Sequence, residues 1–297
     1  ATEPSPSAAR REALLAWYRP RTRAYPWRRK RPDPYSVLVS EFMLQQTQAS
    51  RVAPVFEAFM TRFPTVEALA TASRADVLRA WGGLGYPRRA VALQGSAQVV
   101  LREHGGAVPS DPAVLRSLPG VGEYTAAAVA SLAYRVPIAA VDTNVRRILA
   151  RAVHGVEPDE VVPARIRDDA QSWLDPRQPG SWNQALFDLG RAVCRPAPRC
   201  PECPFRSWCR FVAAGRTGRS STRRQAPFEG SLRQVRGAVV SQLRERSPVT
   251  LGALEVSTGF GQDRIVAAIR GLAHDGVVHA SPAALEGNPR AKVAFFR

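Results

Sequence analysis

The sequence lacks any apolar run near the roughly 18 residues of a membrane-spanning helix, and residues 1–7 lack the pattern of a signal peptide. It has little lysine, which occurs only at Lys30 and Lys292, and its four cysteines are confined to one short segment. Wholesale disorder is excluded, because 45% of the residues are hydrophobic. We therefore expect a soluble, cytoplasmic protein.

Acidic residues are also scarce, since 25 Asp and Glu face 42 Lys and Arg and leave a formal net charge of +17. A high-GC coding bias explains why arginine replaces lysine, but it does not explain the excess of cations over anions. A charge this large favours a polyanionic partner such as nucleic acid, with a generally basic surface as the alternative. The length is typical of about two domains.

The cysteines Cys194, Cys200, Cys203 and Cys209 lie within sixteen consecutive positions. A disulfide framework would distribute its cysteines along the chain, so the tight cluster indicates a metal site instead. A zinc ribbon would have two separate pairs with two residues between their cysteines, and only Cys200 and Cys203 form such a pair.

Helical periodicity runs through most of the chain, with short Gly- or Pro-containing breaks between residues 33 and 140 and no long period-two alternation. The pattern over residues 231–297 predicts three short helices and two strands, a small winged-helix-like α/β module. We expect an arginine-rich linker at 213–230 and a disordered, Pro- and Ser-rich N-terminus at 1–8. The predicted fold class is otherwise all-α.

The segment Leu118-Pro119-Gly120-Val121-Gly122 connects two of the predicted helices. Its two glycines permit a tight turn that comes close to a partner, and the next helix presents free N–H groups at its positive end. The pattern therefore favours a phosphate-binding hairpin in which Gly120 and Gly122 contact DNA. An ordinary helix–helix turn is the alternative.

Two carboxylates allow two interpretations each. Asp142 comes just before a predicted helix and would by default cap it. Glu41 lies in a helix of apolar and amide residues, where the default interpretation is a surface acid.

Five motifs in order resemble the MutY-type adenine DNA glycosylases, which belong to the helix-hairpin-helix, iron–sulfur superfamily of endonuclease III. They are Ser-Glu-Phe-Met-Leu-Gln-Gln-Thr-Gln at 40–48, Trp-Gly-Gly-Leu-Gly-Tyr at 81–86, the hairpin at 118–122, Val-Asp-Thr-Asn-Val-Arg-Arg at 141–147, and the cysteine cluster. The resemblance covers residues 11–210, about two thirds of the chain. It implies a two-lobed helical fold, with a cluster lobe at 9–27 and 138–212 and a six-helix lobe at 28–137.

The resemblance also implies the chemistry. Glu41 would be the general acid that protonates the flipped adenine, and Asp142 would stabilise the positive charge that develops at the sugar. Gln46 and Tyr86 match residues that wedge into the DNA stack while the target base is extruded.

Tyr124 distinguishes two branches of this superfamily. Endonuclease-III-like enzymes have a lysine there, which forms a Schiff base and cuts the strand. A tyrosine implies a monofunctional glycosylase, in which Tyr124 and Asn144 help to hold the catalytic residues.

For the cysteines, the resemblance implies a [4Fe–4S] cluster, with zinc and an empty site as alternatives. The usual first interval in this superfamily is six residues, and here it is five. This shortened loop carries Arg195 and Arg199, which we expect to meet DNA phosphates.

The C-terminus departs from the family pattern. Typical members carry a Nudix-like domain that recognises 8-oxoguanine opposite the adenine, and residues 225–297 are too short and too helical for it. We expect a monomeric, nucleoid-associated bacterial enzyme that removes adenine mispaired with 8-oxoguanine or guanine. The alternatives are a glycosylase for mismatched thymine or another damaged base, and a non-catalytic iron–sulfur DNA-binding regulator.

Overall fold

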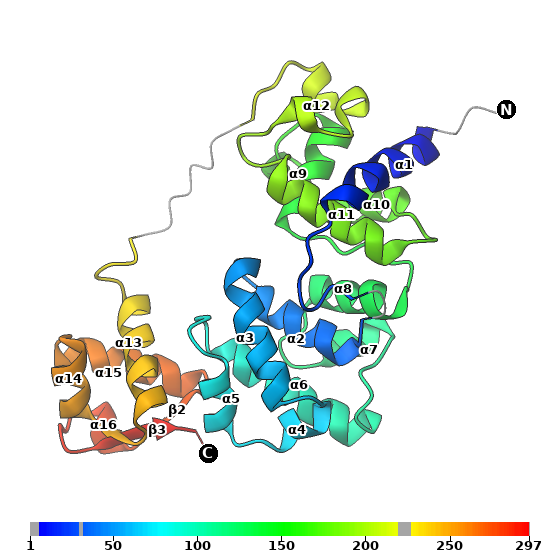
Figure 1. Cartoon of the computed structure of the whole chain (residues 1–297). Helices are drawn as coiled ribbons and strands as arrows, with labels where there is room; N and C mark the ends of the chain where they lie inside the picture. The colour runs from blue at the N-terminus through cyan, green and yellow to red at the C-terminus, as the bar shows by residue number, and fades with distance from the viewer. Residues whose placement is uncertain (1–5, 30–31, 219–226, 297) are drawn as a thin grey trace. The chain divides into compact units, whose positions relative to one another are not determined.

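The computed structural model describes residues 6–29, 32–218 and 227–296, and helices dominate them (Figure 1). Within these residues no helix is long and apolar enough to cross a membrane. The chain folds into two compact units. Unit 1 comprises Ala1–Glu41, Pro109–Ser117 and Val121–Arg224, and unit 2 comprises Phe42–Val108, Leu118–Gly120 and Gln225–Arg297.

Unit 1 is a helical bundle built around its longest internal helix. Its helices are α1 (Pro6–Tyr18), most of α2 (Pro34–Leu44), α7 (Pro112–Ser117), α8 (Glu123–Tyr134), α9 (Thr143–Leu149), α10 (Pro163–Trp173), α11 (Pro179–Ala192) and α12 (Arg210–Ala213). Helix α11 contacts α1, α8 and α9. Trp182 and Leu189 of α11 and Leu14 of α1 are fully buried in one core, because both helices carry an apolar stripe at helical spacing.

The first part of unit 2 consists of four helices. They are α3 (Ala49–Arg62), α4 (Val66–Thr71), α5 (Arg74–Ala80) and α6 (Arg88–His104). Helices α4 and α5 pack against α6, and Phe59 of α3 meets Trp81 edge-on with ring centroids 6.2 Å apart. Ser73 caps α5 through its hydroxyl, which accepts a hydrogen bond from the Asp76 backbone N–H.

The C-terminal part of unit 2 is a small winged-helix-like module. Its elements are α13 (Leu232–Glu245), β1 (Val249–Thr250), α14 (Leu251–Thr258), α15 (Gln262–His274), β2 (Val278–Ala280), α16 (Pro282–Leu285) and β3 (Lys292–Phe295). The three strands are antiparallel in the order β1-β3-β2, with Val249 and Ala280 both opposite Val293.

The predicted fold class is confirmed: helices dominate, and the strands are confined to the C-terminal module. The module has three strands where the sequence predicted two, because β1 spans only two residues and is too short to display an alternating pattern. Helix α1 begins at Pro6, inside the segment 1–8 that we expected to be disordered, while residues 1–5 lie outside the described residues. Residues 219–226, the centre of the expected linker, also lie outside the described residues. The predicted lobe boundaries stay predictions.

Candidate active site

Glu41 lies near the end of α2, and only 5% of the residue is exposed. Burial raises its pKa to about 7, and the charge of Asp142 acts in the same direction, while the Tyr124 hydroxyl and Arg28 oppose the shift. Its Oε2 atom has no hydrogen-bond partner among the described residues. The surface-acid interpretation is therefore wrong: Glu41 is a buried carboxyl that holds or releases a proton near neutral pH.

Tyr124, the second residue of α8, faces Glu41 in unit 1. Its ring packs edge-on against Phe187, with centroids 5.7 Å apart, and its hydroxyl forms a hydrogen bond with Glu41. Burial, followed by the charge of Glu41, raises the pKa of Tyr124 well above its ordinary value. Tyr124 is thus a neutral hydroxyl that orients the acid, and it offers no amine for a Schiff base.

Asp142 is the N-cap of α9, as its position in the sequence predicted. Its Oδ1 accepts hydrogen bonds from the backbone N–H groups of Asn144 (2.9 Å) and Val145 (2.7 Å), and its Oδ2 accepts one from Asn144 Nδ2 (2.7 Å). The cap interpretation is confirmed, and the same carboxylate is also close enough to raise the pKa of Glu41.

Asn144 connects the Asp142 carboxylate to the segment that carries the cysteines. Its Oδ1 accepts a hydrogen bond from Arg147 Nη2 (2.8 Å), and Arg147 Nε donates to the Cys194 carbonyl (2.6 Å). Gly190 of α11 makes room for this arrangement, since a Cβ there would lie 2.5 Å from the Asn144 Cβ. The positions of Asp142 and Asn144 are therefore fixed by both α9 and α11.

Arg28, whose charge acts on Glu41, and its partner Asp188 were missed by the sequence analysis. Arg28 forms a two-pronged ion pair with Asp188 of α11, with Nη1–Oδ2 at 2.8 Å and Nη2–Oδ1 at 3.0 Å. The side chains are only 11% and 8% exposed, and the charge of Arg28 acts on both Glu41 and Tyr124. The one sequence feature that could have singled out Arg28 is its position directly after an aromatic cluster. Its partner Asp188 lies 160 positions away and could not be inferred.

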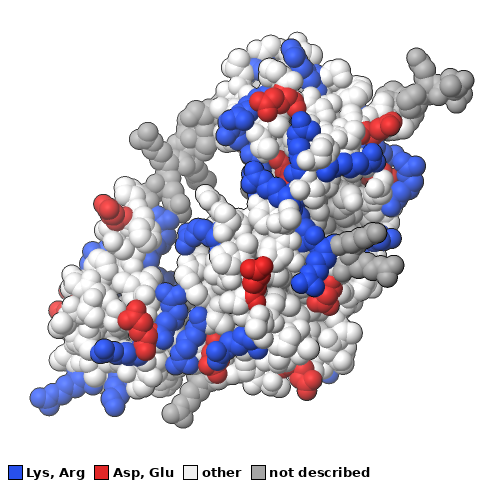
Figure 2. All heavy atoms as spheres, viewed as in Figure 1, with Lys and Arg blue, Asp and Glu red and all other residues white. Residues whose placement is uncertain are grey.

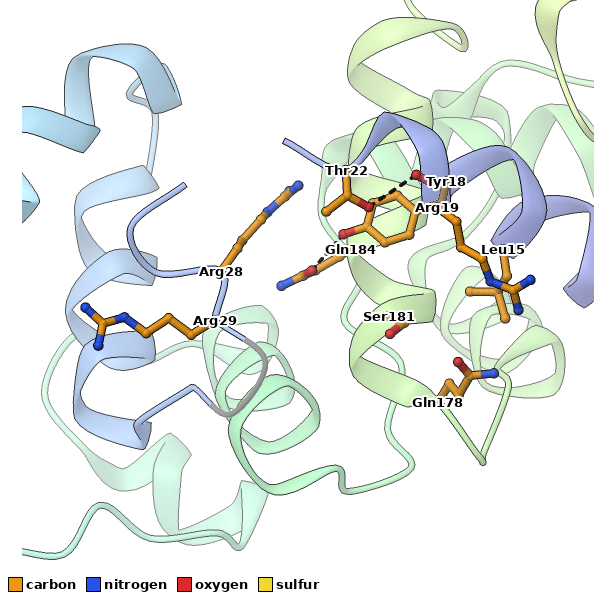
Figure 3. A pocket seen from close by; sticks show the side chains of 9 residues that line it. All are labelled: Leu15, Tyr18, Arg19, Thr22, Arg28, Arg29, Gln178, Ser181 and Gln184. Atoms are coloured by element: carbon orange, nitrogen blue, oxygen red, sulfur yellow. Dashed lines mark hydrogen bonds between the residues drawn. The ribbon is translucent and has the colours of Figure 1, made fainter. Parts of the chain in front are cut away.

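A cavity of about 330 Å³ opens beside Arg28 in unit 1 (Figure 3). Side chains of α1 and α11 line one side, and Arg28 and Arg29 belong to the opposite segment, where the Arg29 side chain points away from α11. The Tyr18 hydroxyl donates to Gln184 Oε1 (2.8 Å) at its edge. The lining combines the apolar Leu15 with polar side chains and three arginines, Arg19, Arg28 and Arg29.

Cys194, Cys200, Cys203 and Cys209 line one cavity, together with the side chain of Arg151. No three of the described His, Cys, Asp or Glu side chains are arranged to hold a single metal ion. A zinc ion would draw its sulfur ligands to within about 4 Å of one another, given a Zn–S distance near 2.3 Å. The four thiols share one cavity and form a cysteine-only donor set, of the kind that also holds iron–sulfur clusters.

The exposed side chains of Arg195 and Arg199 follow Cys194 in the loop. The Arg195 carbonyl accepts a hydrogen bond from Arg151 (2.6 Å), and Arg151 is itself paired with Glu157, so the loop backbone is held from inside. Lys and Arg side chains also outnumber acidic ones on the face of the molecule in Figure 2. This surface suits a polyanion, as the net charge predicted.

The helix-hairpin-helix motif forms where the sequence predicted it, with α7 and α8 joined by residues 118–122. Gly120 has a φ of +74°, and a Cβ there would lie 2.7 Å from Ala92 Cβ and 3.0 Å from Phe42 Cε1. Gly122 is the N-cap of α8 and has open space where a Cβ would be. Gly120 is thus required for packing, and Gly122 presents bare backbone at a helix N-terminus.

Gln46 and Tyr86 are both in unit 2, on the loops that end α2 and precede α6. Gln46 is exposed, and 40% of Tyr86 is exposed. Both have a left-handed backbone, with φ of 56° and 47°. Their role as wedge residues stays a prediction, and the sequence did not predict this shared conformation.

The chain is similar to known DNA repair proteins. Residues 39–173 match the HhH-GPD superfamily of base excision DNA repair proteins. The adenine DNA glycosylase of Mycobacterium tuberculosis is 48% identical over 250 residues, which cover 82% of this chain and 82% of the relative. The human adenine DNA glycosylase is 42% identical over 211 residues, which cover 67% of this chain and 39% of the human protein.

Among solved structures, a thermostable thymine-DNA glycosylase superposes with a TM-score of 0.64 at 27% identity, covering 69% of this chain and 97% of that one. A non-covalent complex of endonuclease III with DNA superposes with a TM-score of 0.58 at 23% identity, covering 69% and 95%, and supports the fold alone. The chain belongs to the HhH-GPD superfamily of base excision DNA repair proteins and, within it, to the MutY-type adenine DNA glycosylases.

Proposed function

We propose that this enzyme removes adenine mispaired with 8-oxoguanine or guanine in duplex DNA by hydrolysing its N-glycosidic bond, without cutting the strand. The observation that carries the proposal is the buried Glu41 with a pKa near 7, facing Tyr124 and close to Asp142. Adenine is a poor leaving group until a ring nitrogen is protonated. A buried carboxyl that is protonated for part of the time at neutral pH supplies that proton.

The second carboxylate supports the same reaction. As the bond between the sugar and the base breaks, positive charge develops at the sugar, and Asp142 can stabilise it. Three hydrogen-bond donors converge on Asp142 from Asn144 and Val145, which is the arrangement that a carboxylate anion needs. Water then completes the hydrolysis. Tyr124 in place of an amine supports base removal without lyase chemistry.

For the cofactor, we propose a [4Fe–4S] cluster held by Cys194, Cys200, Cys203 and Cys209. When bound, it would fix the loop that carries Arg195 and Arg199. Purified enzyme should contain iron and acid-labile sulfide in equal amounts, and Cys209→Ser should lower both. Stoichiometric zinc without sulfide would contradict the cluster.

We propose that the substrate is mismatched duplex DNA and that the enzyme binds it as a monomer. The extruded base would lie beside Glu41. Support comes from the hairpin backbone at Gly120 and Gly122, the exposed Arg195 and Arg199, and the net charge of +17. Gln46 and Tyr86 would occupy the place of the extruded base in the stack.

The direct test of Glu41 is Glu41→Gln. Excision should fall at least about 10²-fold because the general acid is lost, while affinity for the duplex stays within about twofold. The matched control is Glu123→Gln, the same change at a 58% exposed side chain that pairs with Arg167. Unchanged turnover in Glu41→Gln would remove Glu41 from the mechanism.

A further inference from the structure

Arg89, in the first turn of α6, is a buried cation without an acidic partner in the hydrogen bonds and ion pairs of the described residues. Its Nη1 donates to the carbonyls of Phe42 (2.9 Å), Met43 (2.9 Å) and Gln45. Its Nη2 contacts Thr47 Oγ1 (3.1 Å) and the carbonyls of Leu84 (3.2 Å) and Gly85 (3.1 Å). Six oxygens thus surround one guanidinium.

These acceptors come from two loops that are far apart in sequence. Phe42 and Met43 are at the C-terminal end of α2, where the last carbonyls of a helix have no partner within it. Leu84 and Gly85 belong to the loop that leads into α6. A single side chain therefore caps the C-terminus of α2 and holds the loop that leads into α6.

The two loops carry the two predicted wedge residues. Gln45, whose carbonyl Arg89 binds, directly precedes Gln46, and Gly85 directly precedes Tyr86. Gln46 and Tyr86 are two of the three non-glycine residues with positive φ among the described part of the chain. Such a backbone is unfavourable for L-residues and persists only where neighbouring contacts impose it. The guanidinium also lies 5.5 Å from the centroid of the Tyr86 ring.

We propose that Arg89 is a positioning residue that holds Gln46 and Tyr86 together in the left-handed conformation in which they enter the DNA stack. This proposal rests on the proposed function, since it explains how a glycosylase would keep the extruded base out of the DNA stack. Arg89 touches no substrate itself. It acts through the backbone carbonyls on either side of the wedge.

Arginine suits this role and lysine does not. The planar guanidinium directs N–H groups towards both loops at once, whereas an ammonium is a compact donor at one point. The change Arg89→Lys keeps the positive charge and a flexible aliphatic stem, but its single ammonium cannot join the two loops. Arg89→Lys therefore tests geometry rather than charge.

The experiment uses a duplex with adenine opposite 8-oxoguanine and 2-aminopurine as the 3′ neighbour of that adenine. The fluorescence of 2-aminopurine rises when its stacking is lost, so it reports stack opening on binding, and single-turnover excision reports the reaction. In Arg89→Lys, we expect the fluorescence rise to be largely lost and excision to fall at least about tenfold. In a Gln46→Ala/Tyr86→Ala background, the same change should cost nothing further, because the residues through which Arg89 acts are absent.

The matched control is Gln94→Leu, since Gln94 is also buried on α6 and donates to a loop carbonyl, that of Ala72 (2.8 Å), away from the wedge. It should lower Tm and leave the fluorescence rise intact. Thr47→Val is a milder variant, because it removes one hydrogen-bond acceptor of Arg89. The fluorescence rise and the excision rate should both fall, and Thr47→Ser should restore them.

The proposal is overturned if Arg89→Lys and Gln94→Leu lose excision in proportion to their loss of Tm, or if Arg89→Lys still costs tenfold in the double-alanine background. A wild-type enzyme that releases no adenine contradicts the proposed function instead. In that case the fluorescence still reports whether Arg89 governs stack opening.

Discussion

At the scale of single residues, the proton on Glu41 gives a pH test of the reaction. Burial raises the pKa of Glu41 to about 7, so the protonated acid is depleted above that pH. The single-turnover rate of adenine release should therefore fall by about tenfold per pH unit well above neutrality. A rate that stays constant from pH 6 to pH 9 would contradict the role of Glu41.

The same raised pKa makes Glu41 costly for stability. The folded protein keeps a proton that the unfolded chain releases between its ordinary pKa of 4.5 and about 7, so this contribution to stability falls as pH rises through that window. Above it the cost is on the order of 3 kcal/mol. Glu41→Gln should be more stable than wild type in urea at pH 8 and nearly equal at pH 4.5. The Glu123→Gln control should show no such pH-dependent gain.

The sequence could predict Glu41 and Asp142 as a pair because they lie in recognisable motifs. It could not predict that Glu41 is buried, since its environment comes from residues of α8 and α9 and from Arg28. Arg28 and Arg89 were missed for a similar reason: in an arginine-rich chain, composition does not distinguish an exposed arginine from one buried by tertiary packing.

At the scale of elements, we expect the two hairpin glycines to have different roles, Gly120 in packing and Gly122 in DNA contact. Gly120→Ala should lower Tm, because φ is +74° and the new Cβ meets Ala92 and Phe42. Gly122→Ala has open space and should keep Tm within about 2 °C, yet weaken duplex binding about tenfold, because a methyl group covers the helix N-terminus. Thermal unfolding and fluorescence anisotropy measure the two effects. Unchanged affinity in Gly122→Ala would exclude phosphate binding at the hairpin.

The helices themselves were largely predictable, because apolar periodicity and caps such as Ser73 and Asp142 are local signals. The short strand β1 was not, because its two residues pair with β3, more than forty positions away. The same limit applies to Gly190, whose importance arises from Asn144 on another helix.

At the scale of the whole molecule, the net charge of +17 predicts strongly salt-dependent DNA binding. If three or more phosphates are neutralised, the logarithm of the association constant should fall against log salt with a slope of about −3 or steeper. Titrations of one duplex between 50 and 200 mM salt would check this. A slope near zero would place the cations away from the DNA.

Monofunctional removal of adenine by this chain can be tested in a single assay. Wild-type enzyme and Glu41→Gln are incubated under single-turnover conditions with duplexes carrying A opposite 8-oxoguanine, A opposite G, T opposite G, and U opposite G, with and without alkali. We predict adenine release by the wild type only, with strand breaks that require alkali. Release of thymine or uracil, or breaks without alkali, would contradict this account, and tight binding without any release would indicate a regulator.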